Sequence, residues 1–203
     1  MVIASQVPEH RAVFLDRDGV LVVPEMRDGR SYAPRSLGDF RLYPEAKSAL
    51  TRLKQAGYLL VVVTNQPDVG KGLISQSTLD EMHNRIRRVL CVDRIEVCPH
   101  GQADDCSCRK PKPGMLLNAA RECRIDLTMS FMVGDRASDV AAGIAAGCET
   151  IFIDLNYVSE LKPKSPHHTA HSIAEAADII IATNERIGGC HAARSRSEDQ
   201  DLC

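Results

Sequence analysis

The stretch AVFLDRDGV at residues 12–20 joins a short apolar run to two carboxylates and a glycine. A short apolar run that is bounded by polar or turn residues is typical of a buried strand in a parallel sheet. Five more runs share this character: LLVVVTN (59–65), RIEVC (94–98), SFMVGD (130–135), TIFID (150–154) and DIII (178–181). The sequence therefore predicts buried parallel strands, of which the first ends at Asp16.

Segments with helical spacing lie between these runs. The segment PEAKSALTRLKQAG (44–57) begins with Pro and ends in Gly, which are common boundary residues of helices. Three further segments, 75–90, 113–124 and 137–147, show similar patterns. This alternation predicts an α/β fold of the Rossmann-like, three-layer type, in which helices cover both faces of a central parallel sheet.

Length and charge limit the classes of protein to consider. The chain has 203 residues and a formal net charge of −2, so we expect one domain over residues 1–185 and no nucleic-acid partner. Neither a signal peptide nor a membrane-spanning stretch is recognisable, which favours a cytoplasmic protein without a membrane partner. We expect a functional loop over the polar segment 23–43 and a disordered tail over 186–203.

Carboxylates follow two of the predicted strands. Asp16 and Asp18 come at the end of the first strand, and on an extended chain they point to the same side. Asp135 ends a later strand, and ligands of open α/β sheets bind at these strand ends. Carboxylates this close need a cation, for which Mg²⁺ is suited. A surface turn at Asp16 and Asp18 and a helix N-cap at Asp135 are the alternatives.

Groups that can hold a phosphate follow the other strands. Thr64 and Asn65 end the second strand, and a hydroxyl, an amide and free backbone N–H groups there could bind phosphate oxygens. Lys110 could neutralise a phosphoryl group, and Arg109 offers a planar fork of donors. A turn or a solvated basic loop would explain each of these features singly. Their joint position at successive strand ends indicates phosphoryl transfer through an aspartyl phosphate with Mg²⁺.

A group of soft metal ligands lies in CPHGQADDCSC, residues 98–108. Cys98, His100, Cys106 and Cys108 make a Cys₃His set, which is typical of a closed tetrahedral zinc site with no position for substrate. We therefore expect a structural Zn²⁺ in this loop. A redox role is the weaker alternative, because the chain has no CxxC.

The segments DRDGV, VVVTNQ, RKPKPG and GDRASD together resemble the four motifs of the haloacid dehalogenase (HAD) superfamily of phosphatases. The resemblance extends over about residues 11–155 and includes the order and spacing of the motifs. It implies a HAD-type fold, in which the zinc loop would replace the larger cap domain of many relatives. A compact phosphatase of this kind can work as a monomer.

The resemblance also implies a role for each motif residue. Asp16 would be the nucleophile, and Asp18 would be first the general acid and then the base. Thr64 and Lys110 would stabilise the phosphoryl group. Mg²⁺ would be bound by Asp16, by the backbone carbonyl of Asp18 and by Asp135. Substrate contacts would come from Asn65, Gln66, Arg109 and Arg136.

The cysteine cluster before RKP is similar to that of two phosphatase groups, which act on D-glycero-D-manno-heptose 1,7-bisphosphate and on histidinol phosphate. The segments KPKPGMLL and SYAPRSLGDFRLYPEA resemble the first group, whereas the short His100–Cys106 spacing and GDR resemble the second. The segment TNQPDVGKG departs from the TNQSGIARG of the heptose enzymes.

Three hypotheses remain open. We expect removal of the 7-phosphate of the heptose bisphosphate, a small phosphorylated sugar. Histidinol phosphate or another phosphorylated metabolite is the alternative substrate. A zinc-stabilised binding protein without catalysis is the third hypothesis, and the presence of every motif residue argues against it.

Overall fold

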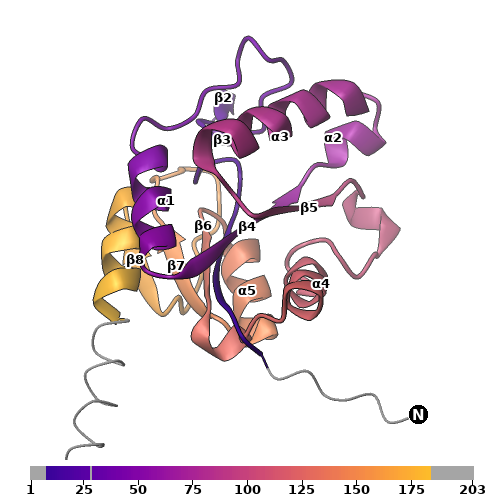
Figure 1. Ribbon diagram of the computed structural model, residues 1–203. Coiled ribbons are helices and arrows are strands. Elements are labelled where there is room, and N and C mark those ends of the chain that lie inside the picture. The colour runs from indigo at the N-terminus through magenta and orange to yellow at the C-terminus, as the bar shows by residue number, and fades with distance from the viewer. Residues whose placement is uncertain (1–7, 28, 184–203) are drawn as a thin grey trace, which may run out of the picture.

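A six-stranded parallel sheet forms the centre of the protein (Figure 1). The computed structural model describes residues 8–27 and 29–183 of the chain. In spatial order, the strands are β5 (Arg94–Cys98), β4 (Tyr58–Asn65), β1 (Arg11–Leu15), β6 (Phe131–Gly134), β7 (Glu149–Ile153) and β8 (His168–Ala170). The predicted α/β fold with a central parallel sheet is confirmed.

Helices cover both faces of the sheet, which produces three layers. The principal helices are α1 (Ala46–Gln55), α3 (Gln76–Leu90), α4 (Gly114–Cys123) and α5 (Ala137–Ala146), and the four predicted helical segments match them. Shorter elements are α2 (Pro67–Gly70) and the 3₁₀ turns Gln102–Asp104 and Leu127–Met129. None of the helices in the described part of the chain has the length and apolar character needed to cross a membrane.

The central strand β1 contributes side chains to two apolar cores. Val13 and Leu15 pack with residues of α1 and α3 on one face. Phe14 points to the opposite face and packs with residues of α4 and α5. The alternation follows from the period of two in a strand, and the unbroken apolar run follows from the burial of both faces. The ends of β1 are therefore held firmly between two helical layers.

The predicted strand at DIII (178–181) is wrong, because residues 173–183 are helical. Their buried side chains, Ile173, Ala176, Ala177 and Ile180, recur every three or four residues and face the core of α1 and α3. This is the period of a helix, and a short apolar run alone does not distinguish a strand from a buried helix. The sixth strand is instead β8.

The segment 23–43, predicted as a polar loop, contains a small antiparallel hairpin. Its strands are β2 (Glu25–Arg27) and β3 (Arg30–Tyr32), with Met26 paired to Ser31. The segment thus has more local structure than its polar composition indicated. The tail predicted to be disordered, 186–203, lies outside the described residues.

Helix α5 packs closely against the sheet at Gly143. A Cβ atom at this position would lie 2.6 Å from the Cβ of Met132 and 2.7 Å from the Cγ2 of Thr150. Both distances are shorter than any normal contact between carbon atoms. The close approach holds the first turn of α5, which carries Asp139, against the end of β6.

We predict that Gly143→Val lowers the free energy of unfolding by about 3 kcal/mol, because the larger side chain forces α5 away from the sheet. Urea unfolding followed by circular dichroism measures the change. Ala145→Val is the matched control, since it adds a similar side chain at an exposed position of the same helix. Equal stability of the two variants would contradict the close packing of α5.

Candidate functional site

A cavity of about 590 Å³ opens at the carboxyl ends of β1, β4 and β6. This is the edge of a parallel sheet at which ligands bind, and the volume suits a small molecule. Asp16, Asp18, Thr64, Lys110 and Asp139 are among the residues that line it. The structure therefore brings together side chains from the ends of successive strands, as the sequence predicted.

Three carboxylates gather at this edge of the sheet, and two of them, Asp16 and Asp139, line the cavity. One oxygen atom from each of Asp16, Asp135 and Asp139 lies within 4.8 Å of the other two, and all three residues are buried. Neither oxygen of Asp135 has a hydrogen-bond partner among the described residues. Burial and the neighbouring charges of Asp16 and Asp139 raise the pKa of Asp135 well above its ordinary value. The site fits a hard divalent cation, which would satisfy these oxygens.

The backbone at Gly19 brings the first motif against Asp135. Gly19 has a φ of +90°, and a Cβ atom there would lie 2.0 Å from Oδ2 of Asp135. Glycine alone adopts this conformation readily and leaves room for the carboxylate. The turn after Asp18 is therefore adjacent to Asp135, which is compatible with the predicted use of the Asp18 backbone carbonyl as a metal ligand.

The ammonium group of Lys110 is buried beside the carboxylates. Its Nζ donates hydrogen bonds to Oδ1 of Asp16 at 2.7 Å and to the carbonyl of Val63 at 2.8 Å. It also lies 2.7 Å from Oδ1 of Asp139. Burial alone would lower the pKa of Lys110, but the charges of Asp139 and Asp16 outweigh it and raise the pKa. Lys110 is therefore held charged next to Asp16.

Asn65 uses its side-chain amide to hold the backbone of Lys110. Its Nδ2 donates to the Lys110 carbonyl, and its Oδ1 accepts from the Lys110 N–H, both at 3.1 Å. Two such bonds fix the peptide as a neighbouring strand would. Asn65 also lines the cavity, where the sequence predicted a substrate contact.

Gln66 connects Asp18, which follows β1, to Thr64 near the end of β4. Its Nε2 donates to Oδ2 of Asp18 at 2.8 Å and to Oγ1 of Thr64 at 2.9 Å. Thr64 and Gln66 are both almost completely buried. The bonds fix the direction in which Asp18 and Thr64 face the cavity.

The two arginines predicted to contact substrate also hold loops around the cavity. Arg109 donates from Nη1 to the carbonyl of His100 at 2.9 Å. Arg136 donates from Nη2 to the carbonyl and the hydroxyl of Ser31, and lies 3.5 Å from Glu160. Arg136 thus ties the hairpin β2–β3 to the segment after β7.

Sequence reasoning missed two charge pairs at this site. Arg35 Nε donates to Oδ2 of Asp68 at 2.7 Å, so the acidic side chain that departs from the heptose-enzyme motif is paired. Arg17, between the two carboxylates of the first motif, is fully buried against Asp18. The strongest signal available was the charged residue inside DRDGV. Asp18 is its neighbour in sequence, but its other polar partner, His83, lies 66 positions away.

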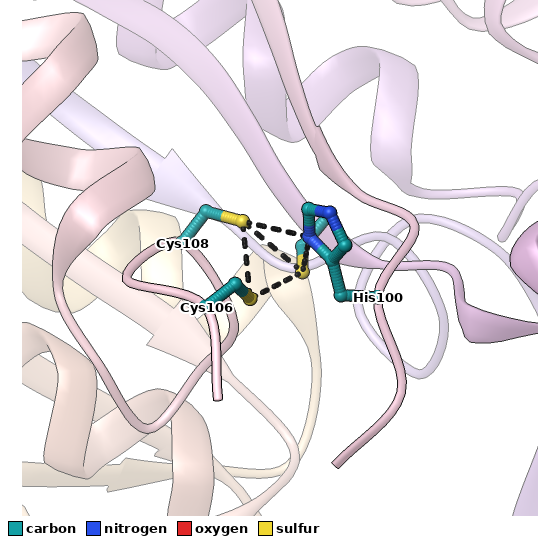
Figure 2. Close-up of side chains that lie close together, drawn as sticks. His100, Cys106 and Cys108 are labelled. Atoms are coloured by element: carbon teal, nitrogen blue, oxygen red, sulfur yellow. Dashed lines mark hydrogen bonds between the residues drawn. The ribbon is translucent and has the colours of Figure 1, made fainter. Parts of the chain in front are cut away.

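The four predicted zinc ligands converge in one cluster. Figure 2 shows His100, Cys106 and Cys108 pointing toward one another, and Cys98 completes the set. Sulfur–sulfur distances are 3.3–3.6 Å, and the Nδ1 of His100 lies 3.4 Å and 3.6 Å from two sulfurs. Edges of a tetrahedron with Zn–S bonds of about 2.3 Å would measure roughly 3.8 Å. The sulfurs are too far apart for disulfides and fit a tetrahedral metal site.

The cysteine cluster belongs to the wall of the cavity. Cys98 ends β5, and its carbonyl accepts a 2.7 Å hydrogen bond from the N–H of Gln66. Cys106 lines the cavity directly, together with Gln102 and Asp105 of the same loop. Ordering of the cluster therefore also orders one side of the cavity and the start of the RKP segment.

Comparisons with known proteins agree with this geometry. The family model described as HAD-hydrolase-like matches residues 107–176. The chain is 36% identical over 183 residues to the D-glycero-beta-D-manno-heptose-1,7-bisphosphate 7-phosphatase of Pasteurella multocida, with 84% of this chain and 96% of that protein covered. The chain belongs to the haloacid dehalogenase superfamily of phosphatases.

Solved structures of this superfamily share the fold. The crystal structure of the D,D-heptose 1,7-bisphosphate phosphatase from B. bronchiseptica, in complex with magnesium and phosphate, matches with a TM-score of 0.72 and 31% identity. The match covers 85% of this chain and 99% of the chain in that crystal structure. A putative HAD-like phosphatase from Mesorhizobium loti has a TM-score of 0.69 at 28% identity, with 91% of each chain covered.

We predict that Mg²⁺ raises the melting temperature of this HAD phosphatase and that Asp135→Asn removes most of the increase. At a concentration of 100 Kd, the cation would add about 2.7 kcal/mol to the free energy of unfolding. Differential scanning calorimetry with and without Mg²⁺ measures the effect.

Asp80→Asn, an exposed substitution on α3, is the control, and Mg²⁺ should raise its melting temperature as much as that of the wild type. Without Mg²⁺, Asp135→Asn should be at least as stable as the wild type, because it removes a buried negative charge beside two others. A full Mg²⁺ shift in Asp135→Asn would contradict the assignment of this carboxylate as a ligand.

Proposed function

We propose that the protein is a Mg²⁺-dependent phosphatase that removes the 7-phosphate of D-glycero-D-manno-heptose 1,7-bisphosphate. The observation that carries the proposal is the position of Asp16 on the wall of the cavity, bonded to Lys110 and grouped with Asp135 and Asp139. The name of the relative in Pasteurella multocida supports the substrate.

Asp16 is the proposed nucleophile. Lys110 occupies its Oδ1, so the other oxygen remains to form the bond to phosphorus. Mg²⁺, held by Asp16, Asp135 and the backbone carbonyl of Asp18, would neutralise charge on the phosphoryl oxygens. Thr64 and the ammonium of Lys110 would bind the same phosphoryl group, which is the arrangement that phosphoryl transfer requires.

Asp18 is the proposed proton donor and acceptor. It lies two residues after the nucleophile and faces the same cavity, with its side chain 15% exposed. It would give a proton to the leaving alcohol when the aspartyl phosphate forms, and then take a proton from the water that hydrolyses the aspartyl phosphate. A positioned general acid of this kind typically contributes about 10²–10⁴-fold to rate.

Cations around the cavity favour a substrate with a second anionic group. Arg109 and Arg136 lie on its wall, and Arg35 offsets the negative charge of Asp68. Pairing of Asp68 removes one objection to a bisphosphate, because an unpaired carboxylate would repel it. Histidinol phosphate remains the second candidate, since the short spacing between His100 and Cys106 resembles that enzyme group.

Cys98, His100, Cys106 and Cys108 are the proposed ligands of a structural Zn²⁺. Their set has no open position, so the metal would order the loop and take no part in the chemistry. The reducing environment of the cytoplasm, our proposed location, would keep these thiols available.

We predict that phosphate release is faster from heptose 1,7-bisphosphate than from histidinol phosphate, with at least a tenfold difference in kcat/KM, or ~1.4 kcal/mol. Both esters are assayed at equal concentration with Mg²⁺. Asp16→Asn should lower turnover by at least about 10³-fold while it keeps the melting temperature near that of wild type. A preference for histidinol phosphate would overturn the substrate, and an active Asp16→Asn would overturn the nucleophile.

We predict that Cys106→Ser loses the bound zinc and lowers the free energy of unfolding by at least ~2 kcal/mol, since metal binding and loop folding are coupled. Atomic absorption and urea unfolding measure the two effects. Cys91→Ser is the matched control, because Cys91 is exposed and outside the cluster. Zinc loss with unchanged stability would contradict the structural role.

A further inference from the structure

The side chain of Arg17 is buried completely, although its two neighbours in sequence face the cavity. A guanidinium group keeps its charge in a protein, so burial is costly unless the charge is paired and hydrogen-bonded. Arg17 is the residue between Asp16 and Asp18, and the proposed mechanism leaves it without a role. The contacts of its guanidinium group indicate a role for this buried charge.

Asp18 is the charged partner of Arg17. The Nη2 atom of Arg17 lies 2.9 Å from Oδ2 of Asp18, and its Nε donates to both carboxylate oxygens at 3.1 Å. The guanidinium thus binds the Asp18 carboxylate on its buried side. A charged donor shared between both oxygens restricts the rotation of the carboxylate as well as its position.

His83 of α3 and the ring of Phe40 hold the other end of the guanidinium. The Nε2 of His83 lies 3.4 Å from Nη1 of Arg17, and the Phe40 ring centre lies 5.8 Å from its Cζ. Arginine has no acceptor, so Nε2 must accept and His83 must be neutral. Burial and the charge of Arg17 lower the pKa of His83 to about 3, which agrees with that state.

The two oxygens of Asp18 are left in different situations. Oδ2 contacts Gln66 Nε2 at 2.8 Å as well as the Nη2 and Nε atoms of Arg17. Oδ1 contacts the Nε of Arg17 at 3.1 Å and no other donor among the described residues that is within hydrogen-bonding distance. Oδ1 therefore keeps more capacity to exchange a proton with a ligand in the cavity.

We propose that Arg17 is a positioning residue: with His83 behind it, Arg17 turns the Oδ1 atom of Asp18 toward the substrate for proton transfer. The inference rests on the proposed phosphatase function and deepens it. In the first step, Oδ1 gives its proton to the ester oxygen as the Asp16–phosphorus bond forms and the ester bond breaks. In the second, Oδ1 takes a proton from water as the water–phosphorus bond forms and the Asp16–phosphorus bond breaks.

Two esters whose leaving groups differ in basicity can distinguish a role of Arg17 in proton transfer from a purely structural role. An alkyl ester such as the heptose bisphosphate needs a proton on its leaving oxygen, whereas p-nitrophenyl phosphate releases a stable anion without one. The value of kcat/KM reports only steps up to formation of the aspartyl phosphate. A misplaced Asp18 therefore slows the alkyl ester selectively, while a damaged cavity slows both.

The experiment compares Arg17→Met with wild type on the two esters, in the presence of Mg²⁺. We expect kcat/KM for the alkyl ester to fall by about 10²-fold or more and that for the aryl ester to change by less than a few fold. Asp18→Asn should show the same selectivity, and the double variant should lose little more. Equal losses on both esters, or no loss, would overturn the inference.

A second pair of variants tests the contact from α3 and guards against misfolding of Arg17→Met. His83→Gln keeps an acceptor for Arg17, and His83→Leu does not. We expect His83→Leu to lower the ratio of kcat/KM for the alkyl ester to kcat/KM for the aryl ester by severalfold. His83→Gln should keep this ratio near the wild-type value. Melting curves confirm that both variants are folded. Identical ratios in the two variants would overturn the part assigned to His83.

The wild-type enzyme separates this inference from the function on which it rests. Turnover of either ester by wild type supports the phosphatase function, whatever the Arg17 variant does. Absence of turnover on both esters would overturn the proposed function and this inference with it. Active wild type together with an unselective Arg17→Met would overturn this inference alone.

Discussion

Buried charge at the end of β1 is the constraint on which the rest of the site depends. Asp16, Asp135 and Asp139 are each at most 6% exposed, and the ammonium of Lys110 bonds to Asp16 and pairs with Asp139. Asp135 is left without a hydrogen-bond partner among the described residues, and its pKa is raised. Carboxylates in such a place are stable only with a further cation or a proton. This excess of buried negative charge makes the site suited to Mg²⁺, which can in turn bind a phosphate.

A rigid frame is needed to hold these charges together, and the parallel sheet supplies it. Asp16 donates from its N–H to the carbonyl of Val133 at 2.9 Å, so β1 and β6 are still paired where the site begins. The turn at Gly19 and the close packing of α5 at Gly143 then bring Asp135 and Asp139 near. Both approaches depend on the absence of a side chain. The ends of β1 and β6 and the first turn of α5 therefore position Asp16, Asp135 and Asp139.

The walls of the cavity come from segments with little apolar core of their own, and polar links hold them. Three cysteines and a histidine converge within the loop 98–108, and Arg136 joins Ser31 of the hairpin to Glu160. Arg35 reaches α2 through Asp68. Because these links are partly exposed, each contributes modestly to stability. Their effect is to fix the shape and the charge of the cavity.

The amino-acid sequence by itself determined the strands β1, β4, β5, β6 and β7, the four principal helices, and motif residues that line the cavity, such as Asp16, Thr64 and Lys110. These features depend on local patterns: apolar runs, helical spacing, and motifs such as DRDGV and CSCRKP. The segment DIII does not reveal the helix at 173–183, because a run of three apolar residues has no distinctive period.

Tertiary structure alone decided how the motif residues use their polar atoms. The bonds of Asn65 to Lys110, of Arg17 to His83 and of Arg35 to Asp68 join residues 45, 66 and 33 positions apart. No local pattern encodes such pairs, because they form only when packing brings separate elements to one edge of the sheet. The sequence thus specified which groups the site contains, and the fold determined which of them face the cavity and which hold the others in place.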